Sequence, residues 1–501
     1  MEGVSSAADR TAVSALANRI ERQRSFVVGD DPRILEGLQG SPEASRLHET
    51  RRLELGLFSD AIGWAVAGTV AGAWRMRPSI NMVHGRVRQF AENVRSEART
   101  PHAKMGRLFD AIQAHLLDAV GFRAVEAVRA ADWGVKIVSD APVEWLPVGR
   151  LPLGLHCDVS RVTATPADLL LRQLETHEML RLGVSDFDEV LLVSTFEEGR
   201  GEDVIKRLLD QVFDIRRITL RLRRVRTEAD LVREVNDYDG PLMIFDGHGA
   251  HPRDEEAHLL VGTERVRVAA LEGRIRLPPI VVLSACDTHA AGRSTRSVAN
   301  SMLRLGARTV LATNLPVRFK EAAMIAGDLI RMIDAYLPFM PGDISRVVRW
   351  SEVVGGLLRA HFIMGIVFRL VDMQAMKEKD TAEFLPGVLL TARFKTGTQA
   401  LAQLENELVS RGVVDSKVFD AIVRRVVSTS DSIRYVQLGN PETIVIGTIA
   451  DLPPEHREQF AGLGPATPVW KLGGDAPAGV IDVREAIGQA PYGPWRGGND
   501  G

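Results

Sequence analysis

The sequence predicts an α/β protein built around a largely parallel sheet. Short apolar runs bounded by Pro and Gly, such as Leu242–Phe245 and Ile280–Leu283, are typical of buried strands and are too short for helices. A segment with helical periodicity follows Cys286 and precedes the next apolar run, Ala307–Thr313. This repeated alternation of strand and helix favours a parallel sheet covered by helices.

Composition excludes several classes of function. The chain has 501 residues, 45% of them hydrophobic, which is enough to bury a large core. Its formal net charge of −3 gives no global field for nucleic acid or for a membrane surface. With only two cysteines, Cys157 and Cys286, we expect a reducing cytoplasm rather than a disulfide scaffold. The N-terminus lacks the basic-then-apolar pattern of a signal peptide.

Two apolar segments resemble membrane spans at first sight. Leu57–Trp74 contains Asp60, and His361–Met373 is interrupted by Arg369 and Asp372. Neither provides the run of about 20 predominantly apolar residues that a spanning helix needs. We therefore expect both segments to be buried core helices and the protein to have no membrane partner.

The chain divides into regions of different character. Residues 1–133 are predicted to form an added helical region with no catalytic spacing. Residues 134–450 are predicted to form the α/β domain, with a helical insertion at about 320–428. Pro and Gly accumulate in residues 451–501, which indicates a loosely held tail. One helix stripe in the first region repeats every four residues: Leu108, Ile112, Leu116 and Val120.

In the first half of the α/β domain, local signals define each element in turn. Thr165-Pro166 is typical of a helix start, and Glu189–Phe196 is an apolar strand. The following loop has Gly199 and Gly201 but lacks Gly-Lys-Ser/Thr, and its acids would repel phosphate. Ile218–Leu222 alternates apolar and polar residues, which predicts a sheet edge with a basic face. No aromatic residues interleave with its arginines, so we expect no nucleic-acid partner.

The alternation continues in the second half of the domain. Thr227 and Asp230 resemble a capping box that opens a helix. The segment HLLVGTERVRV predicts a hairpin that turns at Gly262. A final strand pair is expected to turn at Asn440-Pro441.

Two residues that can act together in catalysis follow the buried strands. His248 follows Leu242–Phe245, and Cys286 follows Ile280–Leu283. Reactive groups gather beyond the carboxyl ends of parallel strands. If these two strands are neighbours, the side chains meet despite their separation in sequence. A thiol beside an imidazole that accepts its proton is the arrangement that nucleophilic catalysis by cysteine requires.

Nearby groups are candidates to assist this pair. The amides of Gly249 and Cys286 are candidate oxyanion donors, and glycine permits close approach of a substrate backbone. A helix predicted to begin near Ser294 would turn its positive end toward the thiol. Asp246 and Asp287 are candidates either to orient the histidine or to receive a basic substrate side chain.

Two other assignments fit the same segment. His251 or His289 is an alternative base, although His248 is favoured because it directly follows the strand. Alternatively, His248, His251, Cys286 and His289 provide a mixture of N and S ligands suitable for zinc. The order of the catalytic motifs explains more residues than ligand counting does. We therefore expect no metal and no organic cofactor.

These residues also resemble a known family. Asp246–Gly249 (DGHG) followed by Val281–Thr288 (VVLSACDT) is similar to the motifs of caspase-like cysteine peptidases of the bacterial CHAT branch. Three further stretches are similar and occur in the family's order: Pro142–Pro166, Leu305–Val317 and Tyr435–Ile446. The resemblance covers residues 134–447 and leaves out the helical N-terminal region.

The resemblance implies a caspase-like, mostly parallel sheet flanked by helices and a cysteine endopeptidase in which Cys286 is the nucleophile and His248 the base. It implies a protein substrate, such as a gasdermin-like pore former or another co-encoded protein, and an activating partner. The implied setting is a regulated bacterial cell-death or antiphage response. Two features depart from the family, since no tetratricopeptide array is present and the insertion at 320–428 is large. The alternative is a catalytically inactive caspase-fold scaffold that binds partners through its helical regions.

Overall fold

The computed structural model describes most of the chain between residues 42 and 447. The described residues are 42–67, 71–96, 102–130, 134–164, 167–175, 178–196, 205, 209, 215–252, 256–286, 288–290, 296–338 and 348–447. Five predicted features lie outside them: the helix start at Thr165-Pro166, the loop with Gly199 and Gly201, Asp287, Ser294 and the tail at 451–501. The predicted boundaries of the three regions stay predictions.

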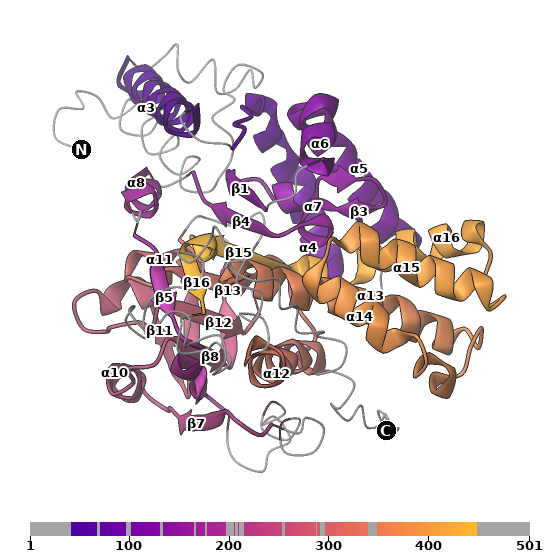
Figure 1. Cartoon of the computed structure of the whole chain (residues 1–501). Coiled ribbons are helices and arrows are strands. Elements are labelled where there is room, and N and C mark those ends of the chain that lie inside the picture. Colours follow the sequence, from indigo (N-terminus) through magenta and orange to yellow (C-terminus); the bar gives the residue numbers. More distant parts are fainter. Residues whose placement is uncertain are drawn as a thin grey trace, which may run out of the picture.

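The centre of the molecule is a mostly parallel sheet (Figure 1). Among the described residues it has eight strands in the order β1-β4-β15-β13-β12-β8-β6-β7. Neighbouring strands are parallel except β13 and β15, which are antiparallel. The strands are β1 (Val135–Val138), β4 (Val159–Val162), β6 (Glu189–Ser194), β7 (Thr219–Arg224), β8 (Leu242–Asp246), β12 (Ile280–Ser284), β13 (Thr309–Thr313) and β15 (Tyr435–Gly439). The predicted fold class, a mostly parallel α/β sheet flanked by helices, is confirmed.

Smaller strands pair outside the central sheet. β9 (His248–Ala250) and β11 (Glu264–Val266) both pair antiparallel with β10 (His258–Val261). The predicted hairpin between β10 and β11 is confirmed, and Gly262 turns it with a φ of 59°. The remaining short strands are β2 (Pro147–Val148), β3 (Leu151–Pro152), β5 (Leu180–Leu182), β14 (Val348–Arg349) and β16 (Ile444–Ile446).

Helices cover both faces of the sheet because successive strand residues point to opposite sides. Leu242, Ile244 and Val282 pack in the same apolar cluster as α12 (Phe319–Ala335) and α13 (Trp350–Asp372). The alternate residues pack against the other layer. That layer consists of α8 (Ala167–Glu175), α10 (Glu228–Asn236) and α11 (Val298–Arg304). As predicted, Thr227 caps α10, since its hydroxyl accepts a hydrogen bond from the Asp230 amide.

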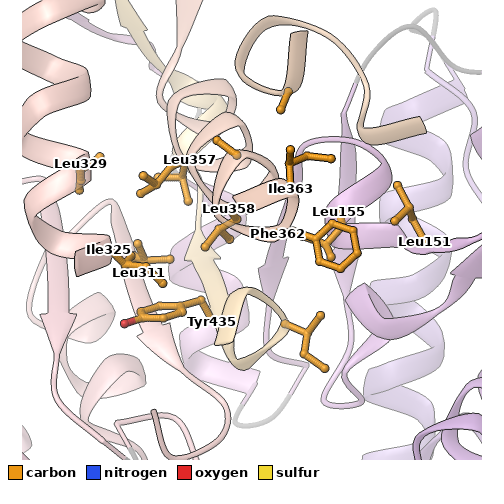
Figure 2. Close-up of a cluster of buried hydrophobic side chains, with 14 of the residues drawn as sticks. Leu151, Leu155, Leu311, Ile325, Leu329, Leu357, Leu358, Phe362, Ile363 and Tyr435 are labelled. Carbon is orange, nitrogen blue, oxygen red and sulfur yellow. The ribbon is translucent and has the colours of Figure 1, made fainter. Parts of the chain in front are cut away.

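The layer of α12 and α13 forms a continuous apolar contact with the sheet (Figure 2). Ile325 and Leu329 come from α12, Leu357 comes from α13, and Leu311 and Tyr435 come from the sheet. All five side chains are buried. The face of the sheet that bears these residues is therefore closed by α12 and α13.

The edge strand β7 behaves as its pattern predicts. Its residues are half-buried or exposed, whereas β8, β12 and β13 are buried along their whole length. Arg221 pairs with Glu189 and Asp237, and Arg223 pairs with Glu234. The basic face of this edge is therefore neutralised by acids of the protein itself.

Helices from both ends of the described chain pack together (Figure 1). α5 (His102–Val120) lies against α16 (Ser416–Thr429). The predicted stripe on α5 is confirmed, because Ile112 and Leu116 are fully buried. The other helices of these groups are α4 (His84–Arg95), α6 (Phe122–Arg129), α7 (Leu153–His156), α14 (Leu385–Phe394) and α15 (Gly397–Ser410). The short 3₁₀ helices are η2 (Pro78–Val83), η4 (Val143–Trp145), η5 (Val184–Phe187), η6 (Val268–Leu271), η8 (Glu378–Thr381), η9 (Asp431–Arg434) and η10 (Pro441–Thr443).

The two segments tested as membrane spans behave differently. α3 (Pro42–Ala67) ends within the first of them, and its Leu57 and Trp64 are 69% and 82% exposed. The prediction of a buried core helix at Leu57–Trp74 is therefore wrong, because α3 presents these side chains to the surface. In the described part of the chain, α13 is the one helix long and apolar enough to cross a membrane. Its apolar window is 72% buried inside the protein, as expected of the core helix predicted there.

Candidate active site

His248 and Cys286 leave neighbouring strands at the same edge of the sheet. β8 and β12 are parallel and directly paired, with Asp246 opposite Ser284. His248 lies two residues beyond Asp246, and Cys286 lies two residues beyond Ser284. The amide of Gly247 donates to the carbonyl of Ser284 at 3.3 Å, so the two chains stay together past the ends of the strands. The structure therefore places the backbones of both residues at the same edge of the sheet, beyond two directly paired strands.

The backbone beyond His248 lies directly against Cys286. A Cβ on Gly249 would stand 2.5 Å from the carbonyl oxygen of Cys286 and 3.1 Å from Cγ2 of Thr288. Only glycine permits this approach without a shift of the neighbouring backbone. The assignment of the Gly249 and Cys286 amides as oxyanion donors stays a prediction.

A row of polar side chains crosses the sheet just below this edge. Ser194 is paired with Asp246, Asp246 with Ser284, and Thr313 with Tyr435. The register of β12 and β13, in which Val282 lies opposite Leu311, brings Thr313 level with Ser284. Residues opposite one another share a face, so this row lies on the side covered by α12 and α13.

Two threonines fix the backbone on both sides of Cys286. The Thr313 hydroxyl donates to the carbonyl of Ala285 at 3.0 Å, and the Thr313 amide donates to Thr288 Oγ1 at 3.1 Å. Both threonines are buried. Ala285 precedes Cys286, and Thr288 follows it by two residues. These hydrogen bonds therefore hold the turn that bears the cysteine in one geometry.

Asp246 does not fit one of its two predicted roles. Its side chain is 1% exposed, and its Oδ1 accepts a hydrogen bond from the Ser284 hydroxyl at 3.2 Å. A buried carboxylate within the sheet cannot receive a basic side chain of a substrate, so this prediction is wrong for Asp246. Its role in orienting His248 stays a prediction, and Asp287 lies outside the described residues.

The two cysteines have different surroundings. Cys286 is partly exposed, and its thiol donates to the carbonyl oxygen of Val317 at 3.2 Å. Cys157 is buried, and burial raises the pKa of its thiol to about 12, with Asp158 acting in the same direction and Arg359 against it. Because the thiolate is the nucleophile, the accessible Cys286 is favoured over the buried Cys157 as the reactive cysteine.

The His248 ring is exposed and rests on an aromatic side chain. It packs edge-on against Phe196 with 5.2 Å between ring centroids, and Phe196 packs in the same way against Phe319 at 5.3 Å. The backbone of His248 is paired with Leu260 in β9 and β10, so it belongs to a strand rather than to a free loop. Phe196 and the strand pairing together fix the position of the ring.

The alternative bases are placed differently. His251 and His289 are buried, and His289 Nδ1 shares a hydrogen bond of 2.9 Å with Ser297 Oγ. Burial lowers the pKa of His289 well below its ordinary value, and the nearby Arg161 and His251 lower it further. A ring enclosed in this way has no access to a substrate, which favours His248 as the base.

The described residues give no support to the zinc alternative. Among them, no group of three or more His, Cys, Asp or Glu side chains is placed to hold a metal ion. The thiol of Cys286 contacts Val317, and Nδ1 of His289 contacts Ser297. The side chains of Cys286 and His289 are therefore held by contacts other than a metal site.

The helix after the cysteine has a serine cap. α11 starts at Val298, and the Ser297 hydroxyl caps it by accepting from the Asn300 amide at 3.1 Å. The Ala299 amide donates to the carbonyl of Thr288 at 3.1 Å, which connects this helix to the turn that bears Cys286. Ser294, near which the start was predicted, lies outside the described residues.

A separate hollow has Tyr435 among its lining residues. It encloses about 490 Å³, with its open side included, and is lined by residues of η4, α7, β4, α13 and β15. Glu144 and Arg161 form an ion pair of 3.3 Å in its wall. Neither His248 nor Cys286 lines it, so the hollow is not where the predicted chemistry would occur.

Sequence analysis did not identify several residues around the site. These residues are Phe196, which follows β6, Thr313 of β13, Val317, which precedes α12, Phe319 of α12 and Tyr435 of β15. Leu305–Val317 and Tyr435–Ile446 belong to the stretches that resemble the family, which was the one available signal for three of them. Nothing in the sequence indicated that Phe196 and Phe319 meet.

Comparison with protein-family models and with curated proteins finds no match. Among solved structures, the chain is similar to two crystal structures of the Saccharomyces cerevisiae separase–securin complex, at 3.0 and 2.6 Å resolution. The identities are 13% and 12%, and the TM-score is 0.32 for both. Each alignment covers 87% of this chain but 27% of the matched chain. Similarity at this level does not by itself establish a shared fold.

Proposed function

We propose that this protein is a caspase-like cysteine endopeptidase in which Cys286 is the nucleophile and His248 the base. One observation supports the proposal above all others. The parallel strands β8 and β12 are adjacent and in register, so that an exposed imidazole and a partly exposed thiol leave the same sheet edge. A thiol and its base must lie within reach of each other before either can act.

In the proposed reaction, His248 accepts the thiol proton of Cys286, and the thiolate attacks the carbonyl carbon of the scissile peptide bond. The amides of Gly249 and Cys286 would donate to the oxyanion of the tetrahedral intermediate. His248 then protonates the leaving amine, and water hydrolyses the acyl-enzyme. The close contact between Gly249 and the Cys286 carbonyl supports this arrangement, since it brings together the two backbone segments that carry the proposed amides.

The finer assignment rests on the resemblance of the motifs. We propose that the protein belongs to the bacterial CHAT branch and acts in the cytoplasm in a regulated cell-death or antiphage response. Its substrate would be a co-encoded protein such as a gasdermin-like pore former, and an activating partner would bind the helical regions. The packing of α5 against α16 supports this view, because it joins the helices from both ends of the described chain in one surface.

The test is cleavage of co-encoded proteins by purified full-length protein. Wild type and Cys157→Ala should cleave the same neighbour, whereas Cys286→Ala and His248→Ala should not. Cleavage by Cys286→Ala at the wild-type rate would reject the nucleophile. The assay is repeated with all co-encoded proteins and with nucleic acids from an infected cell. If no form of the protein cleaves a neighbour under these conditions, the inactive scaffold is favoured.

A further inference from the structure

The Tyr435 hydroxyl is buried next to the candidate site without using its hydrogen-bonding capacity. The side chain is 4% exposed, and its oxygen has no hydrogen-bond partner among the described residues. Buried hydroxyl groups nearly always have a partner, so an exception calls for an explanation. By contrast, the hydroxyl of the equally buried Tyr238 donates to the carbonyl of Glu189 at 2.9 Å.

The position of Tyr435 puts this hydroxyl on the same side of the sheet as the chain segment that contacts the cysteine. Tyr435 begins β15 opposite Thr313, the residue that holds the carbonyl of Ala285. In Figure 2 its hydroxyl end points away from Leu155, on the side where Leu311 and Ile325 lie. Ile325 belongs to α12, and the chain entering α12 contains Val317, whose carbonyl accepts the Cys286 thiol. The hydroxyl and the thiol therefore share one side of the sheet.

The surroundings of the Tyr435 hydroxyl determine whether it keeps its proton. Burial is the main cause that raises the pKa of Tyr435 well above its ordinary value. The charges of Asp431, Cys286 and Glu321 raise it further, and Arg434 acts in the opposite direction. Tyr435 thus keeps its proton at neutral pH and is available as a donor.

We propose that the Tyr435 hydroxyl donates a hydrogen bond to the Cys286 thiolate once His248 has taken the proton. This inference deepens the proposed function and rests on it for its catalytic meaning. The thiol now donates to the Val317 carbonyl at 3.2 Å. When the proton moves from sulfur to the imidazole, the sulfur becomes an acceptor and is repelled by that carbonyl. The sulfur then turns to the unused donor, and Tyr435 keeps its own proton throughout.

The role is tested by the pH dependence of alkylation of Cys286 by iodoacetamide, measured by mass spectrometry on the full-length protein. Tyr435→Phe keeps the ring and removes the donor, so the midpoint of the profile should move to higher pH by about 1. Tyr238→Phe removes an equally buried hydroxyl far from the thiol and should leave the midpoint unchanged. An unchanged midpoint in Tyr435→Phe would overturn the proposal.

A second variant covers the case in which Tyr435→Phe does not fold. Replacement of Tyr435 by 3-fluorotyrosine keeps the shape and makes the hydroxyl a stronger donor, so the midpoint should move to lower pH; no movement would count against the proposal. Alkylation does not require a peptide substrate. A shifted midpoint in a protein that cleaves nothing would uphold the role of Tyr435 and reject the protease. Cleavage by wild type together with an unshifted midpoint in Tyr435→Phe would uphold the protease and reject the role of Tyr435.

Discussion

The α-carbon of Gly249 lies so close to the carbonyl group of Cys286 that a methyl group at residue 249 would stand 2.5 Å from its oxygen. This contact joins the two segments that leave β8 and β12, and with them the imidazole of His248 and the thiol. It is a backbone contact, so it holds the site together whatever the conformation of the two side chains.

Gly249→Ala tests this contact directly. The added methyl group must push the Cys286 carbonyl away, and overpacking of this kind costs about 1–3 kcal/mol of unfolding free energy. We expect that loss in urea titrations, together with loss of cleavage. Gly85→Ala is the control, since a Cβ there meets nothing within 4 Å and the helical position should gain stability. Full activity of Gly249→Ala would show that the close approach has no function.

Thr313→Val tests how the turn bearing Cys286 is held. Loss of the hydroxyl removes the 3.0 Å bond to Ala285, and an unsatisfied buried group costs about 1–3 kcal/mol. We expect a lower kcat with little change in KM. Thr309→Val is matched, because Thr309 lies at the other end of β13 and donates to the Leu438 carbonyl at 2.8 Å. It should lose similar stability and keep its kcat; equal activity of both variants would contradict the role of Thr313.

The two cysteines should differ strongly in reactivity. Burial raises the pKa of Cys157 to about 12, so roughly one molecule in 100,000 has a Cys157 thiolate at pH 7. Iodoacetamide at pH 7 should modify Cys286 in the native protein and leave Cys157 intact, as peptide mapping by mass spectrometry would reveal. Cys286→Ala should then remain unmodified. Modification of Cys157 at a comparable rate would contradict the expectation.

The protein should lose stability in mild acid because of His84. Burial lowers the pKa of this histidine from 6.5 to about 4, with smaller effects in the same direction from Arg161 and Arg88. The folded state therefore favours the neutral ring, and this contribution is complete above pH 6.5 and lost as the pH falls toward 4. The loss amounts to about 3 kcal/mol for His84 alone.

Urea titrations between pH 7.5 and 4 measure this effect. His84→Leu, which removes the titrating ring from its buried position, should show a smaller loss of unfolding free energy in acid. His248→Leu changes an exposed ring and should retain the wild-type loss. If the unfolding free energy of His84→Leu fell with pH as steeply as that of wild type, His84 would not be the cause of the loss.

Asp328 connects three elements of the helical layer. It pairs with Arg331 on its own helix α12, with His361 of α13 at 3.3 Å and with Arg393 of α14 at 3.7 Å. Burial would raise the pKa of Asp328, but Arg331, the hydrogen bond with His361 and Arg393 outweigh it and hold the pKa well below its usual range. The carboxylate is therefore charged whenever the protein is folded at neutral pH.

Asp328→Asn should lower the unfolding free energy by about 3–5 kcal/mol, because it leaves the buried Arg393 without its anionic partner. Urea titration at pH 7 measures this loss. Asp239→Asn removes one partner of a largely exposed ion pair with Arg276 and should change stability by at most about 1 kcal/mol. A loss no greater in Asp328→Asn than in Asp239→Asn would be contrary to this account.

Much of the central sheet could be predicted because its strands have strong local signals. The apolar runs ending before His248 and Cys286 are bounded by Gly and Pro, and each forms a buried strand. The cap at Thr227 and the turn at Gly262 are likewise set by side chains within a few residues. The sequence left open whether β8 and β12 are neighbours, and the tertiary structure decided that they pair directly.

Predictions of whether a side chain is buried or exposed were less successful, because they depend on distant parts of the chain. Asp246 follows an apolar strand and precedes a glycine, yet it is enclosed by β6 and β12, which removes it from contact with a substrate. Leu57 and Trp64 are apolar and lie on an exposed helix. Burial depends on what packs over a residue, and the local pattern does not contain that information.

The sequence by itself determined where the buried strands lie and which reactive residues follow them, because helix and strand periodicity arise from neighbours in the chain. Only the tertiary structure decided that β15 enters the sheet antiparallel beside β13, that Thr313 holds the carbonyl of Ala285, and that the Cys286 thiol contacts Val317. These contacts join segments that are far apart in sequence. Their formation depends on the packing of whole helices and strands, which no short stretch of residues specifies.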